Sequence, residues 1–329
     1  MKKNYSTKDI IETISDYITN HAQILLNYNN FNDWEKEYRN IEDKNIKMIF
    51  PEFVHHNFPL KTDVLKLIIK KLFNVMPFSK ANILKYYEKT LYDIDYLFYP
   101  SSQKNKVKKL MIFFSGFSGK KTYNRFSWYW DETEKWESDT IYLFLNDMSE
   151  TWYLGTPNDP RLSKYIKIIE NVIKEYEIKN ENIFTIGGSM GGYIAILLAF
   201  KMNFKACIAV HPQITYKATR KYINDSWETK IRQCEHLFYD LTDYIFKINH
   251  RPLIYLEYGM AECDVDACEE FISALQKKEC LCFFRKSANS SHNTDNPSFT
   301  TIENLIKFFE NTGYDDNFIG DNKRNNNEI

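Results

Sequence analysis

The chain has 329 residues, enough for one large domain or two, and 43% of them are hydrophobic, so a sizeable core can form. Its 43 Lys and Arg residues nearly balance 44 Asp and Glu residues, which leaves a formal net charge of −1. This balance creates no strong overall field, so nucleic acid is not expected as a partner. The six cysteines lack disulfide-framework or zinc spacing, which indicates free thiols in a reducing compartment.

Residues 1–90 are predicted to form a mainly helical extension. Apolar residues recur at helical spacing in residues 10–18 and again in residues 65–72. Lysines in and beside the second segment give residues 61–73 a basic surface for peripheral membrane contact, although a solvated helix face is the simpler explanation. No run reaches the roughly 20 apolar residues of a membrane span and no secretory signal is found, so a cytoplasmic location is expected.

Strands and helices alternate between residues 91 and 310. Residues 92–99 and 107–114 are predicted as strands that pair in an antiparallel hairpin. The alternation predicts an α/β fold with a mostly parallel central sheet and helices on both faces. The remaining strands are predicted at residues 140–145, 183–186, 206–210, 253–258 and 280–285, and the helices at residues 162–176, 193–200, 265–275 and 301–309.

Two segments stand apart from this alternation. Residues 213–251 form a long insertion between two strands, rich in Tyr, Trp and charged residues, and are expected to cap the active site. Residues 311–329 are polar and rich in Asn, which predicts a flexible tail. The expected organisation is therefore a helical extension (1–90), a catalytic domain (91–310) and a tail.

The most informative motif is a serine inside a cluster of glycines. Only ten glycines occur in the chain, and four of them, Gly187, Gly188, Gly191 and Gly192, surround Ser189. A strand-like run precedes the cluster and an apolar helical run follows it, which is the setting of a nucleophile elbow. Small neighbours suit the tight, strained turn that exposes the serine. Ser189 is therefore the candidate nucleophile.

Other glycine-rich sites do not fit this cluster. A phosphate-binding P-loop needs a lysine after its last glycine, but Tyr193 follows Gly192. The glycine spacing also differs from that of a dinucleotide-binding turn. No His, Cys and carboxylate cluster has metal-ligand spacing. We therefore expect no cofactor and no metal for a hydrolytic reaction.

The elbow, the strand–helix alternation and the order Ser…acid…His make residues 90–310 resemble the α/β-hydrolase superfamily. The resemblance covers about two thirds of the chain. It implies an α/β-hydrolase fold and a serine esterase or acyltransferase that works through a Ser-His-acid triad. It also implies that the histidine follows the last strand and that the acid follows the strand before it.

The position expected for the base selects one of the seven histidines. Only His292 lies beyond the last predicted strand and before the closing helix, in a polar loop of small residues. An imidazole there can take the proton of the Ser189 hydroxyl and later return it to the leaving group. His211, after the strand that follows the elbow, is expected to line the pocket.

The acid is expected in the loop after residues 253–258. Superfamily members often place it a few residues after a glycine such as Gly259, which gives Glu262. Asp264 is the close alternative, and Asp266 is expected to cap the following helix. The sequence leaves Glu262 and Asp264 both open as the residue that orients His292.

An oxyanion hole needs two backbone N–H groups aimed at the developing negative charge. The first is expected from Met190, which follows the nucleophile. The second is expected from Phe117, in the loop after residues 107–114. Many superfamily members have His-Gly where this chain has Ser115-Gly116, so the loop departs from the common form.

The predicted reaction transfers an acyl group to Ser189 and then releases it. Release to water makes an esterase-type hydrolase acting on an acyl ester, which is the main prediction. A weaker resemblance to bacterial capsule polysaccharide O-acetyltransferases, and to the glycan-acetylating component of accessory Sec secretion systems, implies an alternative. In it, acetyl-CoA is the co-substrate, a surface glycan accepts the acetyl group, and aromatic residues 126–130 and 152–153 stack on sugar rings. A third hypothesis is an inactive scaffold that binds a partner through its N-terminal helices.

Overall fold

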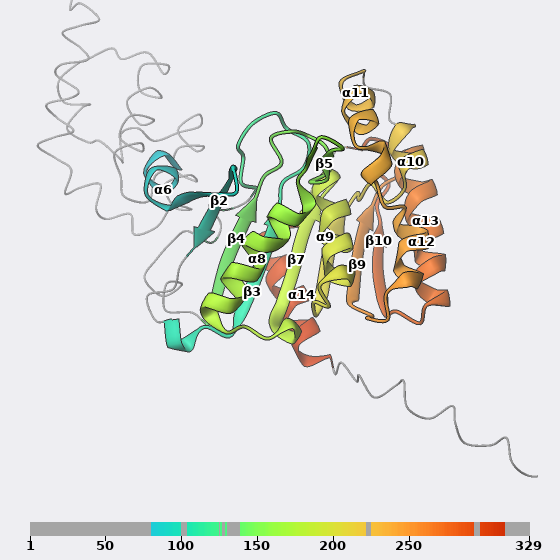
Figure 1. Ribbon diagram of the computed structural model, residues 1–329. Coiled ribbons are helices and arrows are strands. Elements are labelled where there is room, and N and C mark those ends of the chain that lie inside the picture. Colours follow the sequence, from blue (N-terminus) through green and yellow to red (C-terminus); the bar gives the residue numbers. More distant parts are fainter. Residues whose placement is uncertain are drawn as a thin grey trace, which may run out of the picture. The chain divides into compact units, whose positions relative to one another are not determined.

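The computed structural model describes residues 80–99, 104–124, 126, 129, 139–221, 225–292 and 297–312 (Figure 1). Most of the predicted helical extension, including residues 61–73, lies outside the described residues, as does the tail from residue 313. The expected domain boundaries at residues 90 and 310, the peripheral membrane contact and the cytoplasmic location therefore stay predictions. Within the described part of the chain, no helix has the length and hydrophobicity that crossing a membrane requires.

The described residues fall into two compact units. The first contains residues 80–89, 97–99, 126 and 129, with helix α6 (Lys80–Tyr87). The second contains the remaining described residues and all of the candidate site. Strands β1 (Glu88–Leu91) and β2 (Ile94–Tyr99) each have residues in both units.

The second unit is built on a parallel sheet. Its strands lie in the order β4-β3-β7-β8-β9-β10, and each pairs in parallel with its neighbour. Every residue of β7 and β8 is buried, as expected for inner strands of a sheet covered on both faces. The predicted α/β fold is confirmed. The strands are β3 (Lys109–Phe114), β4 (Thr140–Leu145), β7 (Ile183–Gly188), β8 (Ala206–Val210), β9 (Leu253–Tyr258) and β10 (Cys282–Lys286).

The predicted antiparallel hairpin is wrong. Strand β3 pairs with β4 along one edge and with β7 along the other, so neither edge of β3 is open to residues 92–99. Closeness along the chain favoured the hairpin. Both partners of β3 instead come from later in the sequence through crossover connections, which local residue patterns do not reveal.

Helices cover both faces of the sheet (Figure 1). Helices α8 (Leu162–Tyr176) and α9 (Met190–Lys201) lie on one face, and α14 (Phe299–Asn311) lies on the other. The buried residues of α8 form one stripe, whereas α9 is buried all round from Met190 to Phe200. After β9 comes the long helix α13 (Glu262–Lys277). The smaller elements are η1 (Lys104–Lys106), β5 (Gly155–Thr156), β6 (Asp159–Pro160) and η3 (Asn180–Asn182).

The insertion at residues 213–251 consists of short helices. Helix α10 (Tyr216–Arg220) begins with the Thr215 side chain accepting a hydrogen bond from the Ala218 N–H. Helix α12 (Leu241–Tyr244) begins similarly with Asp240. The other helices of the insertion are α11 (Asp225–Gln233), η4 (Glu235–Leu237) and η5 (Ile245–Lys247).

The contact between helix α9 and strand β3 requires a glycine at position 191. A Cβ added to Gly191 would lie 2.3 Å from the Phe114 carbonyl oxygen, whereas one added to Gly116 would meet nothing closer than 3.2 Å. We expect Gly191→Ala to lower the free energy of unfolding by about 3 kcal/mol, the upper end of typical overpacking costs. Gly116→Ala should cost under about 1 kcal/mol. Equal midpoints in chemical denaturation would contradict this packing argument.

Candidate active site

Ser189 occupies the turn between β7 and α9. Its backbone is strained, with φ 54 and ψ −122, and its N–H donates a 2.8 Å hydrogen bond to the Val210 carbonyl at the end of β8. A Cβ on Gly187 would lie 2.1 Å from the Gly191 carbonyl oxygen, so the turn closes only with glycine there. The strand, the strained serine and the helix follow one another as in a nucleophile elbow, which is what the sequence predicts.

A continuous chain of hydrogen bonds joins Ser189, His292 and Asp264. The Ser189 Oγ lies 2.8 Å from His292 Nε2, and His292 Nδ1 lies 2.7 Å from Asp264 Oδ1. All three residues are buried, with exposed fractions of 9%, 8% and 3%. With the Nδ1 proton donated to the carboxylate, Nε2 is free to accept the serine proton. The arrangement can therefore perform nucleophilic acyl transfer.

Glu262, the other candidate acid, lies away from His292. Its side chain is 80% exposed and its Oε1 lies 3.1 Å from Lys221 Nζ. Helix α13 begins at Glu262, and two residues of helix turn by about 200°, so Glu262 and Asp264 lie on opposite faces. Asp266, one turn beyond Glu262, pairs with the same lysine instead of capping the helix. Glu262 as the acid and Asp266 as the cap are both wrong.

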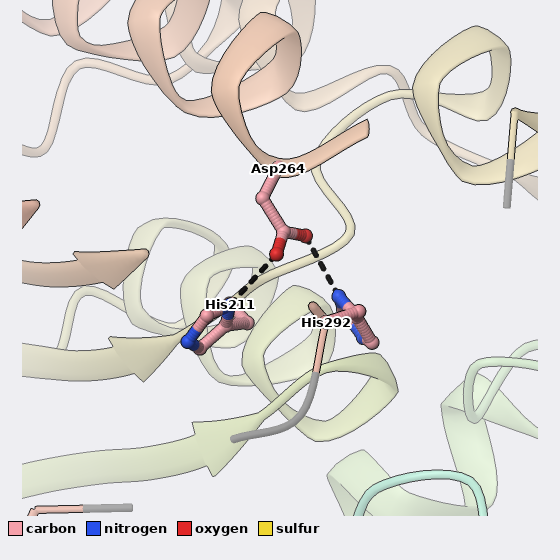
Figure 2. Close-up of side chains that lie close together, drawn as sticks. All are labelled: His211, Asp264 and His292. Carbon is pink, nitrogen blue, oxygen red and sulfur yellow. Dashed lines mark hydrogen bonds and ion pairs between the residues drawn. The ribbon is translucent and has the colours of Figure 1, made fainter. Parts of the chain in front are cut away.

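Asp264 has a second imidazole partner. His211 Nδ1 lies 2.7 Å from Asp264 Oδ2, so each carboxylate oxygen is bonded to one histidine (Figure 2). Burial raises the pKa of the Asp264 carboxyl, but the hydrogen bonds from His211 and His292 outweigh it and hold that pKa below its usual value. The carboxylate therefore stays ionised where His292 must accept a proton.

In the described part of the chain, the same three side chains also lie close enough together to hold a metal ion. One ligand atom from each of His211, Asp264 and His292 lies within 4.8 Å of the others. Both Nδ1 atoms, however, are at hydrogen-bond distance from the carboxylate. Hydrogen bonding accounts for the closeness of the cluster without a metal.

The two expected oxyanion donors lie on either side of the elbow. Met190 is the first residue of α9, so its N–H has no partner within the helix. The loop that holds Phe117 passes close to the elbow, because a Cβ on Gly116 would lie 3.2 Å from the Gly188 carbonyl oxygen and 3.8 Å from Ser189 Cβ. Both segments therefore lie beside Ser189, and donation by their N–H groups to an oxyanion stays a prediction.

The sequence analysis missed the hydrogen-bonded anchor that fixes the loop after β4, which is built on Asp147. The buried Asp147 carboxylate accepts hydrogen bonds from the backbone N–H groups of Ser149, Thr151 and Tyr153, at 2.7 to 3.0 Å. The Tyr153 hydroxyl in turn donates to the Ser115 carbonyl at 2.9 Å, at the start of the Phe117 loop. The pattern of Asp followed by Ser and Thr, at steps of two, is typical of side-chain-stabilised turns and could have revealed the anchor.

Aromatic side chains surround the site. Trp227, in α11 of the insertion, packs edge-to-face on His292 at 5.5 Å between ring centroids, and Phe117 lies 5.4 Å from Trp227. Trp152 lies 6.0 Å from Trp227, and its Nε1–H donates to Gln213 Oε1 at 2.7 Å. The insertion therefore reaches the base, as a cap would.

The proposed sugar-stacking role of residues 152–153 is wrong. Trp152 and Tyr153 are both fully buried, so neither offers a ring face to a ligand at the surface. In the other aromatic segment, Phe126 and Tyr129 are also buried, while residues 127, 128 and 130 lie outside the described residues. These rings serve packing in the described part of the chain.

Comparison with known families identifies this arrangement. The model of the prolyl oligopeptidase family matches residues 146–312, about half of the chain, including Ser189, Asp264 and His292. The chain belongs to this family. It is therefore a serine hydrolase of the α/β-hydrolase type. The hypothesis of an inactive scaffold is not supported. No curated protein matches the sequence significantly.

Solved structures resemble this chain at low sequence identity, and the first two named here share its fold. Fluorophosphonate-binding serine hydrolase F of Staphylococcus aureus is 14% identical, with a TM-score of 0.52 over 68% of this chain and 96% of that chain. S-formylglutathione hydrolase of the same organism is 14% identical, with a TM-score of 0.50 over 66% and 93%. A capsule O-acetyltransferase of Neisseria meningitidis serogroup A is 18% identical, with a TM-score of 0.49 over 68% and 93%.

The opposite orientations of the two carboxylates can be tested by matched substitutions. Asp264→Asn should lower kcat by about 10⁴-fold, because the amide no longer selects the Nδ1–H form of His292. Glu262→Gln should leave kcat within about twofold, because Glu262 contacts only Lys221 in the solvent. The measurement is steady-state hydrolysis of a p-nitrophenyl ester. A large loss in Glu262→Gln would show that the acid had been misassigned.

Proposed function

We propose that the protein is a serine esterase, in which Ser189 is the nucleophile, His292 the general base and Asp264 the acid that orients it. The observation that carries the proposal is the unbroken hydrogen-bond chain from the Ser189 hydroxyl to the Asp264 carboxylate, with links of 2.8 and 2.7 Å. Its burial supports the same conclusion, since desolvated charges interact more strongly with the reacting atoms.

The first half-reaction acylates Ser189. As the Ser189 oxygen attacks the ester carbonyl, His292 Nε2 takes the hydroxyl proton and becomes positively charged against Asp264. The carbonyl oxygen becomes an oxyanion, which the N–H groups of Met190 and Phe117 stabilise. His292 then gives its proton to the alcohol oxygen, the carbon–oxygen bond breaks, and the alcohol leaves.

The second half-reaction restores the enzyme. A water molecule attacks the acyl carbon while His292 takes one of its protons, and the same N–H groups stabilise the second oxyanion. His292 returns the proton to the Ser189 oxygen as the carboxylic acid departs. Every step is a proton or acyl transfer between groups of this chain, substrate and water, so the cycle requires no cofactor.

The surroundings of the triad support an acyl ester as substrate. Trp227 places an apolar ring beside His292, and the Phe117 ring packs on Trp227, which suits an uncharged acyl group. An ester oxygen also needs less proton transfer to leave than an amide nitrogen, which must be protonated before its bond to carbon breaks, so an ester makes smaller demands on the site than a peptide. Acetyl transfer from acetyl-CoA to a glycan uses the same triad, but the described aromatic residues that favoured it, Phe126, Tyr129, Trp152 and Tyr153, are buried.

The nucleophile can be tested with a fluorophosphonate probe, which forms a covalent bond to an activated serine. The protein should be labelled, and Ser189→Ala should abolish both the labelling and p-nitrophenyl acetate hydrolysis. Ser163→Ala, an exposed position in α8, is the matched control and should change neither. Persistent labelling of Ser189→Ala would refute the proposed nucleophile.

The acceptor of the acyl group can be tested separately. Consumption of acetyl-CoA and of p-nitrophenyl acetate is followed with and without a capsule-type glycan. For an esterase, ester turnover should proceed in water alone and should not rise with the glycan. Turnover that depends on the glycan and gives acetylated product would replace the esterase with the acetyltransferase.

A further inference from the structure

The proposed mechanism uses one of two imidazoles that bind the Asp264 carboxylate. His292 needs a single acceptor for its Nδ1–H, and Asp264 Oδ1 provides it. His211 Nδ1 lies at the same distance, 2.7 Å, from the other carboxylate oxygen, Oδ2 (Figure 2). His211 is 2% exposed, so a buried polar side chain is maintained at the acid without any part in the proton transfer.

The backbone of His211 is tied to both segments that must be aligned. His211 directly follows β8, and the preceding Val210 carbonyl accepts the hydrogen bond from the Ser189 N–H. The His211 N–H itself donates to the Glu257 carbonyl of β9 at 2.6 Å, close before the acid along the chain. His211 therefore links the strand beside the nucleophile to the strand that leads to Asp264.

The conformation of His211 is unusual for a residue with a side chain. Its φ is +45, in the left-handed region, where a glycine would be unstrained. Such backbone strain costs about 1–3 kcal/mol and persists where the surroundings impose it, often at functional sites. The imidazole is also confined, because a Cβ on Gly259 would lie 3.1 Å from His211 Cε1.

We infer that His211 is a positioning residue for the acid: it fixes the Asp264 carboxylate toward His292 and shares its negative charge with that base. The inference rests on the proposed triad. His211 acts through Asp264 and is not itself a catalytic residue.

Sharing the carboxylate limits how strongly Asp264 stabilises the charged form of His292. Two N–H donors divide the acceptor capacity of one carboxylate, so each receives less than a sole partner would. The titratable groups that face His211 are Asp264 from α13 and His292 from the loop after β10. Cys263 of α13 contacts Asp264, and Glu257 of β9 accepts the His211 N–H through its backbone carbonyl. Glu257 is itself paired with Arg285. Burial raises the pKa of the Cys263 thiol to about 12, so this thiol is uncharged at neutral pH. Asp264 is therefore the negative charge that the His211 side chain contacts.

The test compares three substitutions of His211 in the full chain. In His211→Asn the side-chain amide nitrogen takes the place of Nδ1 and can still donate to Asp264. In His211→Gln that nitrogen lies one bond farther out, and in His211→Leu no donor remains. The rate of p-nitrophenyl acetate hydrolysis is measured as kcat and KM from pH 5 to 9, and folding is checked by the unfolding midpoint.

We expect His211→Leu to lower kcat by about 10- to 100-fold, the loss typical of a partner that orients a functional histidine. KM should stay unchanged, because the buried His211 side chain bonds to Asp264 and is only 2% exposed. The acid limb of the kcat profile should move up, because the His211 hydrogen bond that lowers the pKa of the Asp264 carboxyl is lost in this variant. His211→Gln should follow His211→Leu, while His211→Asn should recover most of the rate and the original profile.

Two outcomes would overturn the inference. Wild-type kcat and pH profile in His211→Leu would show that the second imidazole does not act on the site. Equal losses of kcat in His211→Asn and His211→Gln, without a shift in the acid limb, would show that His211 contributes only to packing. If His211→Leu does not fold, the Asn and Gln pair still decides. Hydrolysis that survives in Ser189→Ala would instead refute the proposed function, whatever the His211 variants do.

Discussion

The site depends on a close approach of backbones that only glycine allows. At Gly187 and Gly191 an added Cβ would lie 2.1 and 2.3 Å from a carbonyl oxygen, so neither position has room for a side chain. This contact brings the first turn of α9 against the end of β3. As a result the strained Ser189, the first residue of α9 (Met190) and the Phe117 loop lie together. The geometry of the nucleophile and of the oxyanion donors thus has one steric origin.

The acid depends on a different constraint, the rotation of one helix. Because α13 begins at Glu262, its first three carboxylates divide between two faces. Glu262 and Asp266 point to Lys221 in the solvent, and Asp264 points into the protein against two imidazoles. The same helical turn therefore supplies a surface ion pair on one side and the buried charge of the site on the other.

Much of the fold was predictable from the sequence because hydrophobic runs mark buried strands directly. The strands at residues 140–145, 206–210 and 253–258 have the expected bounds. The acid was left open for a local reason: the helix was expected from residue 265 but begins at Glu262, and those three residues decide which carboxylate faces inward. Helix ends are set by capping and tertiary contacts that periodicity does not contain.

Contacts between distant segments were harder to predict. The order of the strands places β4 and β7 beside β3, and no local pattern distinguishes this from a hairpin. His211 was expected near the pocket, but its bond to Asp264 joins residues 53 positions apart. The sequence contains the residue types of such a site, whereas their partners follow only from the packed structure.

The contact between Trp227 and His292 couples the insertion to the base. The indole of Trp227, in α11, lies edge-to-face on the imidazole at 5.5 Å between ring centroids. A substitution that moves α11 therefore also changes the surroundings of the base, although α11 contributes no residue to the proposed triad.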